Sequence, residues 1–115
     1  MTDTAELDVQ RDRAAKNQSL FREVNERIED LSRSGQLATF VCECCNDECD
    51  ESLSLSLDEY EHVRARSNSF FVLPGHEVSE VEEIIESRER YEVVAKLGVG
   101  SSVAERLDPR KRVRR

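Results

Sequence analysis

The feature that most constrains this chain is a cluster of thiols, because all four cysteines lie within residues 42–49. In a reducing compartment, cysteines this close in sequence favour a metal site over disulfides. Acidic residues surround the thiols at Glu43, Asp47, Glu48 and Asp50. Neighbouring carboxylates raise the pKa of a thiol, which argues against reactive thiolates. Free thiols and a regulatory disulfide are the alternatives to a bound metal.

Three of the four cysteines suit a single ligand set. Cys42 and Cys44 lie two residues apart on an expected strand, so both side chains point to one face. Cys49 can return across the loop from the facing arm of a hairpin. Cys45 points to the opposite face if the strand continues, so it is the least expected ligand. Three thiolates leave one position in the tetrahedral coordination that Zn²⁺ prefers.

The fourth ligand has three candidates, Cys45, His62 and His76. His62 lies at the spacing of a two-cysteine, two-histidine finger, but no second histidine follows it three to five residues later, so that pattern fails. His76 follows Pro74-Gly75, and such a tight turn can aim an imidazole at a neighbouring hairpin. The favoured ligand set is Cys42, Cys44, Cys49 and His76. Since four protein ligands leave no open position on the metal, we expect a structural Zn²⁺ and no enzymatic activity.

Charge and length limit the classes of function. The chain has 115 residues and a net charge of −8, and residues 42–61 hold eight acids with no lysine or arginine. Such a surface repels nucleic acid and membrane surfaces and suits a basic protein partner. Residues 110–115 carry five positive charges in six residues, but no aromatic residues interleave them, so a nucleic-acid interaction is not expected. The polar start lacks an apolar signal segment and no apolar run is long enough to span a bilayer, so we expect a cytoplasmic protein without a membrane partner.

Helical periodicity marks the N-terminal part of the chain from about Ala14 to Ser32. The apolar residues that recur at helical spacing are Phe21, Val24, Ile28 and Leu31. We expect this stripe to face the core or, if the sheet is too small to cover it, a protein partner or a second copy of the chain. Residues 1–13 are expected to form a flexible segment before the helix.

The rest of the chain predicts a small α+β domain that spans residues 14–109. Strands are expected over residues 37–44, 52–57, 70–73 and 91–97, and short helices over residues 57–66 and 102–108. Ser56 and Glu59 fit a capping box at the start of the first short helix, and Ser102 and Glu105 suggest a cap for the second. Residues 77–87 fit either a helix or a strand. The predicted fold is a long N-terminal helix, an antiparallel sheet of four or five strands and short helices, followed by a disordered basic tail over residues 110–115.

Four segments of the chain, residues 21–29, 40–49, 55–60 and 71–77, together resemble a family of small uncharacterised bacterial proteins. The resemblance covers roughly residues 14–109. It implies cysteines at the positions of Cys42, Cys44 and Cys49 together with the Pro-Gly-His turn, and so it supports His76 over His62 as a ligand. Cys45 departs from the family pattern. The family has no assigned activity, so the resemblance adds little about function.

The sequence therefore favours a small cytoplasmic zinc-binding protein that acts as a protein-interaction or regulatory module. The alternative is a redox-responsive regulator, in which oxidation of the thiols releases zinc and loosens the fold. A small zinc enzyme is the third hypothesis.

Overall fold

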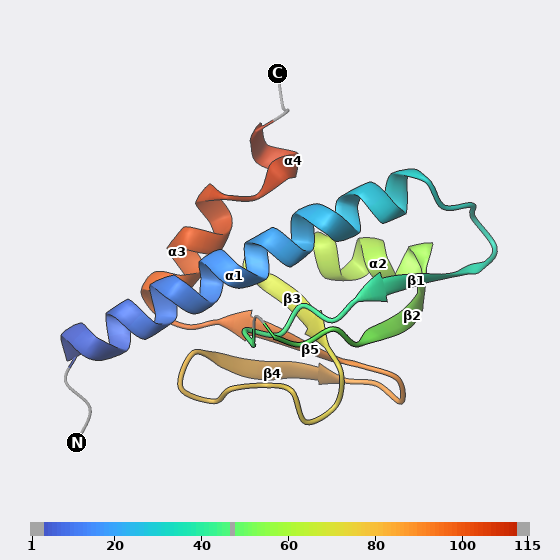
Figure 1. The fold of residues 1–115 in the computed structure, drawn as a ribbon. Helices are drawn as coiled ribbons and strands as arrows, with labels where there is room; N and C mark the ends of the chain where they lie inside the picture. Colours follow the sequence, from blue (N-terminus) through green and yellow to red (C-terminus); the bar gives the residue numbers. More distant parts are fainter. Residues whose placement is uncertain (1–3, 47, 113–115) are drawn as a thin grey trace.

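The computed structural model describes residues 4–46 and 48–112 of the chain. The elements follow one another as α1 (Thr4–Asp30), β1 (Leu37–Val41), β2 (Ser52–Ser56), α2 (Leu57–Arg64), β3 (Ser69–Val72), β4 (Glu82–Ser87), β5 (Glu92–Lys96), α3 (Val99–Arg106) and α4 (Pro109–Arg112). Helix α1 crosses the molecule beside α3, and the strands lie together on one side of it (Figure 1). The fold is α+β, which confirms the predicted class.

The strands form two antiparallel sheets rather than the single sheet that was predicted. β1 pairs with β2 in a hairpin, and β5 lies between β3 and β4 in the second sheet. The chain leaves β1 after Val41, and Glu43 N donates a hydrogen bond to Phe71 O (3.0 Å) in β3. The cysteine segment therefore joins the two sheets instead of continuing the first strand to residue 44.

The long helix was predicted to begin near Ala14, but α1 begins at Thr4, so residues 4–13 belong to it. Residues 1–3 of the expected flexible segment lie outside the described part of the chain. The apolar stripe does not form the core face, because Val24 is 47% exposed and Leu31 is 84% exposed. Phe21 and Ile28 are half-buried, and Ile28 packs against the core.

The face of α1 that is buried is mainly polar. Its buried residues are Ala14, Ala15, Gln18, Ser19, Arg22 and Asn25. Gln18, Arg22 and Asn25 follow one another at helical spacing, so they form a stripe of their own. The hydrophobic pattern missed this face because polar side chains are buried only where partners satisfy them, and those partners lie far away in sequence.

The second hairpin strand and the start of α2 match the prediction, although α2 ends at Arg64. Ser56 Oγ accepts a hydrogen bond from Glu59 N (3.1 Å), and Ser56 N donates to Glu59 Oε1 (2.9 Å), so the predicted capping box is present. α2 then buries Tyr60 and Val63. The ring of Tyr60 stacks on Phe40 of β1 with a centroid distance of 4.6 Å. These contacts anchor the hairpin from which the cysteine segment extends.

The C-terminal part settles one open alternative and departs from the prediction at two points. The ambiguous segment 77–87 forms strand β4 over its second half. Helix α3 begins at Val99 without a side-chain cap, so the expected cap at Ser102 is wrong. Arg110 lies in α4 and binds Glu26 and Glu61, whereas a disordered tail was expected from that residue onward. Residues 113–115 of that tail lie outside the described part.

Candidate metal centre

Backbone hydrogen bonds tie the cysteine segment to strand partners on both sides, at Cys42 and at Glu43. Cys42 N donates to Glu51 O (3.0 Å), which continues the hairpin beyond β1, while Glu43 bonds to β3. Side chains alternate along such a segment, so Cys42 and Cys44 point to one face and Glu43 to the other. Both thiols are buried, at 1% exposure each.

A tight turn after β3 brings His76 to the same place. His76 N donates to Leu73 O (3.0 Å), and Gly75 occupies a positive φ of 89° that a residue with a side chain rarely adopts. Cys49 reaches the site from the other arm of the hairpin. The Nδ1 atom of His76 lies 3.6 Å from Cys42 Sγ and 3.8 Å from Cys49 Sγ.

The structure thus brings together the four residues that the sequence singled out. The ligand atoms of Cys42, Cys44, Cys49 and His76 all lie within 4.8 Å of one another. Four donor atoms at this spacing can hold one metal ion between them.

Burial controls the protonation of the two inner thiols. It raises the pKa of Cys42 and of Cys44, because a thiolate is poorly solvated there. The amide of Leu73 donates to Cys42 Sγ (3.3 Å) and partly offsets this effect. Both thiols therefore keep their protons at neutral pH unless a cation stabilises the thiolates.

Two carboxylates near the centre were not predicted as functional residues. Glu51 Oε2 lies 3.7 Å from His76 Nε2, which leaves Nδ1 as the ring atom that faces the thiols. That distance is longer than a hydrogen bond, and the Glu51 side chain is 60% exposed. The second carboxylate, Glu43, lies between Cys42 and Cys44 in the sequence, and it is fully buried in the structure. The alternation of side chains along a strand places Glu43 on the face opposite the thiols, so the orientation of Glu43 could have been predicted from the sequence.

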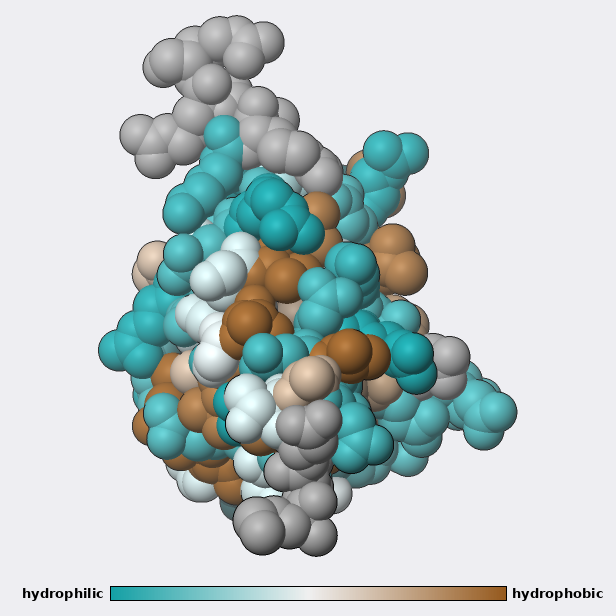
Figure 2. All heavy atoms as spheres, turned by 90° about the vertical axis from the view of Figure 1, so that its left-hand side faces the viewer, coloured by the Kyte–Doolittle hydropathy of each residue, from teal (hydrophilic) through white to brown (hydrophobic). Residues whose placement is uncertain are grey.

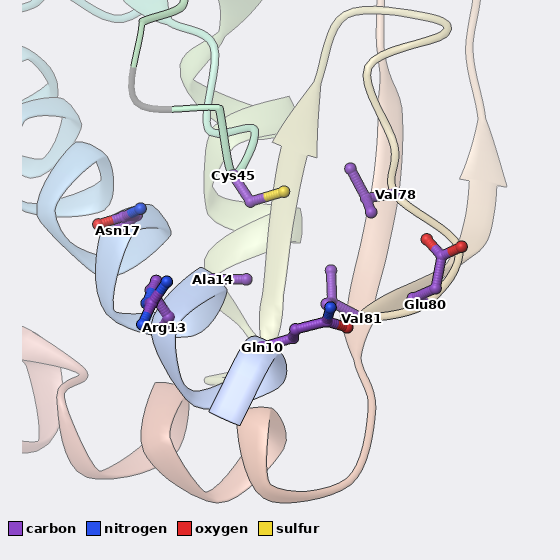
Figure 3. Close-up of a pocket in the computed structure, with 8 residues that line it drawn as sticks. All are labelled: Gln10, Arg13, Ala14, Asn17, Cys45, Val78, Glu80 and Val81. Carbon is purple, nitrogen blue, oxygen red and sulfur yellow. The ribbon is translucent and has the colours of Figure 1, made fainter. Parts of the chain in front are cut away.

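Cys45 and His62 lie apart from the four clustered residues. Cys45 points into a cavity of about 380 Å³ between α1 and the segment before β4 (Figure 3). The cavity is lined by Gln10, Arg13, Ala14, Asn17, Cys45, Val78, Glu80 and Val81. His62 Nε2 lies 2.6 Å from Glu86 Oε2, a hydrogen-bond contact on the exposed side of α2. The cluster of potential ligands found among the described residues contains neither of them.

No family model, no curated protein and no solved structure matches this chain. The resemblance to a family of small bacterial proteins stays a prediction. Among the described residues, no helix is long and apolar enough to cross a membrane.

Proposed function

We propose that this chain is a zinc-binding protein whose metal centre consists of Cys42, Cys44, Cys49 and His76. The observation that carries the proposal is the spacing of the donor atoms. With Zn–S of about 2.3 Å and Zn–N of about 2.1 Å, a tetrahedron places sulfur and nitrogen about 3.6 Å apart. The distances from His76 Nδ1 to Cys42 Sγ and Cys49 Sγ, 3.6 and 3.8 Å, agree with that value. Three thiolates and one imidazole suit Zn²⁺ better than the hard cations Mg²⁺ and Ca²⁺, which take oxygen ligands.

The role of this zinc is structural rather than catalytic. Four protein ligands fill a tetrahedral site and leave no position for a reactive water. Cys42 extends from the first sheet, and His76 follows the last residues of β3 in the second sheet. An ion bound between them fastens the two sheets together. Small domains commonly depend on such a cross-link because their cores are limited.

The outer face of α1 is the surface that we propose for a protein partner. The exposed apolar residues of α1 and of the residue that follows it are Val9, Leu20, Val24 and Leu31. The predicted partner face of Phe21, Val24, Ile28 and Leu31 therefore shifts around the helix, because Phe21 and Ile28 turn partly inward. On the face of the molecule shown in Figure 2, apolar side chains lie in small groups between hydrophilic ones. A protein-interaction or regulatory module in the cytoplasm is the role that fits this surface and the net charge of −8.

A redox-responsive regulator is the second candidate, and the position of Cys49 favours it. Cys49 is half-buried, whereas Cys42 and Cys44 are sealed from solvent. An oxidant would therefore reach the thiolate of Cys49 first, and the loss of one ligand would weaken zinc binding. Zinc release on treatment with dilute peroxide, abolished by a chemical reductant, would support this candidate. If zinc stays bound under peroxide, the redox candidate is wrong and only the structural role remains.

Metal analysis of the purified chain and four variants tests the proposed ligand set. We expect one zinc per wild-type chain, and its loss in Cys42→Ser and His76→Ala. His62→Ala and Cys45→Ser are matched controls, since each removes the same type of side chain outside the cluster, and both should keep the zinc. A wild-type chain that purifies without zinc and does not take it up would refute the proposal.

A further inference from the structure

Asn25 on α1 binds directly to the backbone that carries the clustered thiols. Its Nδ2 donates to Val41 O (2.9 Å), and its Oδ1 accepts from Val41 N (2.9 Å). The amide of Asn25 therefore pairs with both backbone groups of the residue before Cys42, as a neighbouring strand would. Seven residues earlier on the same helix, Gln18 Nε2 donates to Glu43 O (2.8 Å).

The side chain of Glu43 extends this attachment on the face opposite the thiols. Its carboxylate accepts from both terminal nitrogens of Arg64, at 3.0 and 2.6 Å, and from Asn25 Nδ2 at 2.8 Å. Phe71 N donates to the same carboxylate at 3.2 Å. With Glu43 and the Arg64 side chain sealed from solvent, these bonds fix how the segment is rotated about its own axis.

The same rotation decides where the thiols of Cys42 and Cys44 point. In an extended segment, the side chains on the two faces turn together, so aiming Glu43 at α1 also aims both thiols at His76. A metal held by the thiols fixes the rotation from the other face. Docking of α1 on the Glu43 face therefore prepares the segment for zinc binding on the thiol face, and zinc binding prepares it for the docking of α1.

We infer that Asn25 and Glu43 are positioning residues of the metal centre, and that zinc binding and the docking of α1 on the cysteine segment are coupled. The inference rests on the proposed zinc function. Coupling is reciprocal, so zinc strengthens the attachment of α1 by the same factor by which α1 strengthens zinc binding. Neither positioning residue is itself a zinc ligand.

Urea unfolding with and without zinc tests the coupling, because the difference between the two curves gives the zinc Kd of the folded chain. We expect Asn25→Ala to raise this Kd at least tenfold. Arg22→Met is the matched control. Arg22 is also buried on α1, but it donates to Ser67 O and Ala104 O rather than to the cysteine segment. The Arg22→Met variant should lower the unfolding free energy by the same amount with and without zinc. Its zinc Kd should therefore stay within about twofold of wild type.

Hydrogen exchange of the wild-type chain gives a second readout that needs no variant. Removing zinc with a chelator should speed exchange of the α1 amides around residues 18–25 at least tenfold more than exchange of the amides in β5. An equal increase in both elements, or none in α1, would refute the coupling. So would an Asn25→Ala chain that binds zinc as tightly as wild type, and that result would leave the zinc centre itself standing. A wild-type chain that binds no zinc would overturn both proposals.

Discussion

The aromatic core and the buried face of α1 are both sealed from solvent, but different forces hold them. In the core, Phe40, Tyr60 and Phe71 meet with ring centroids between 4.6 and 5.9 Å apart. On α1, Gln18, Arg22 and Asn25 are no more than 1% exposed, and each bonds to groups on other elements. One interface depends on shape and apolar area, and the other on matched donors and acceptors.

The difference teaches which region can tolerate substitution. Apolar packing is not directional, so a core accepts another apolar side chain of similar volume at low cost. A buried polar group that loses its partner keeps the full cost of having left water. The α1 interface therefore fixes the register of the helix strictly. It also ties the helix to the cysteine segment, whereas the core only holds the elements together.

The largest effect is expected from Glu43→Ala, which leaves the guanidinium of Arg64 buried without its partner. Breaking one side of a buried ion pair costs about 3–5 kcal/mol of unfolding free energy. Arg90→Ala is the control, because its contact with Glu59 is exposed and is worth at most about 1 kcal/mol. Urea unfolding at constant zinc measures both variants. Equal losses in the two would contradict the distinction between a directional buried interface and the surface.

Introducing a methionine into each of the two regions sharpens the comparison. Gln18→Met removes hydrogen bonds with Glu43 O, Glu82 Oε1 and Lys96 Nζ. Lys96 and Glu82 still pair with each other, but a buried group left without a partner costs about 1–3 kcal/mol. Leu55→Met in the core keeps the volume and should cost less than about 1.5 kcal/mol. Thermal unfolding of the two variants side by side measures the difference. A smaller loss for Gln18→Met than for Leu55→Met would be evidence against a directional interface.

Two adjacent residues on α2 should control opposite ends of the pH range. Burial raises the pKa of Tyr60 in the core, so its contribution to stability is complete below pH 10 and is lost as the pH rises further. A hydrogen bond from Arg110 lowers the pKa of Glu61 on the surface, so its contribution is present above about pH 4.5 and is lost on acidification.

Unfolding free energy measured across pH tests both assignments. Tyr60→Phe should flatten the alkaline limb, where one proton changes the stability by up to about 1.4 kcal/mol per pH unit. Arg110→Ala should flatten the acid limb by less, because Glu61 is about half exposed. An alkaline limb that keeps its slope in Tyr60→Phe would show that Tyr60 is not the group responsible.

The smallest effect is expected on the outer face of α1. Leu31 is 84% exposed, so Leu31→Ser should change the unfolding free energy by no more than about 0.5 kcal/mol. The same variant should weaken binding to a protein partner if this face is the docking surface. A stability loss above 1 kcal/mol would mean that Leu31 is covered in the folded chain.

Local signals in the sequence predicted much of the fold. The capping box at Ser56 and Glu59, the hairpin and the Pro-Gly-His turn depend on neighbouring residues, so single-sequence patterns reveal them. The four clustered ligands were predicted for the same reason, since strand alternation and one tight turn aim them at a common point.

Non-local pairing explains the failures. The buried face of α1 could not be read from the sequence, because Gln18 and Asn25 are buried only on account of partners on other elements. The apolar residues Val24 and Leu31 dominated the helical pattern instead, although they face solvent. The division into two sheets was missed because the course of the chain after Val41 is set by the bond between Glu43 and Phe71.

X-ray absorption at the zinc edge of the purified wild-type chain tests the central proposal most directly. A centre of three cysteines and one histidine predicts three sulfur neighbours at about 2.3 Å and one nitrogen neighbour at about 2.0–2.1 Å. The spectrum should be unchanged in Cys45→Ser, since Cys45 faces the cavity beside α1. A shell dominated by oxygen, or one with fewer than three sulfur atoms, would contradict the proposed centre.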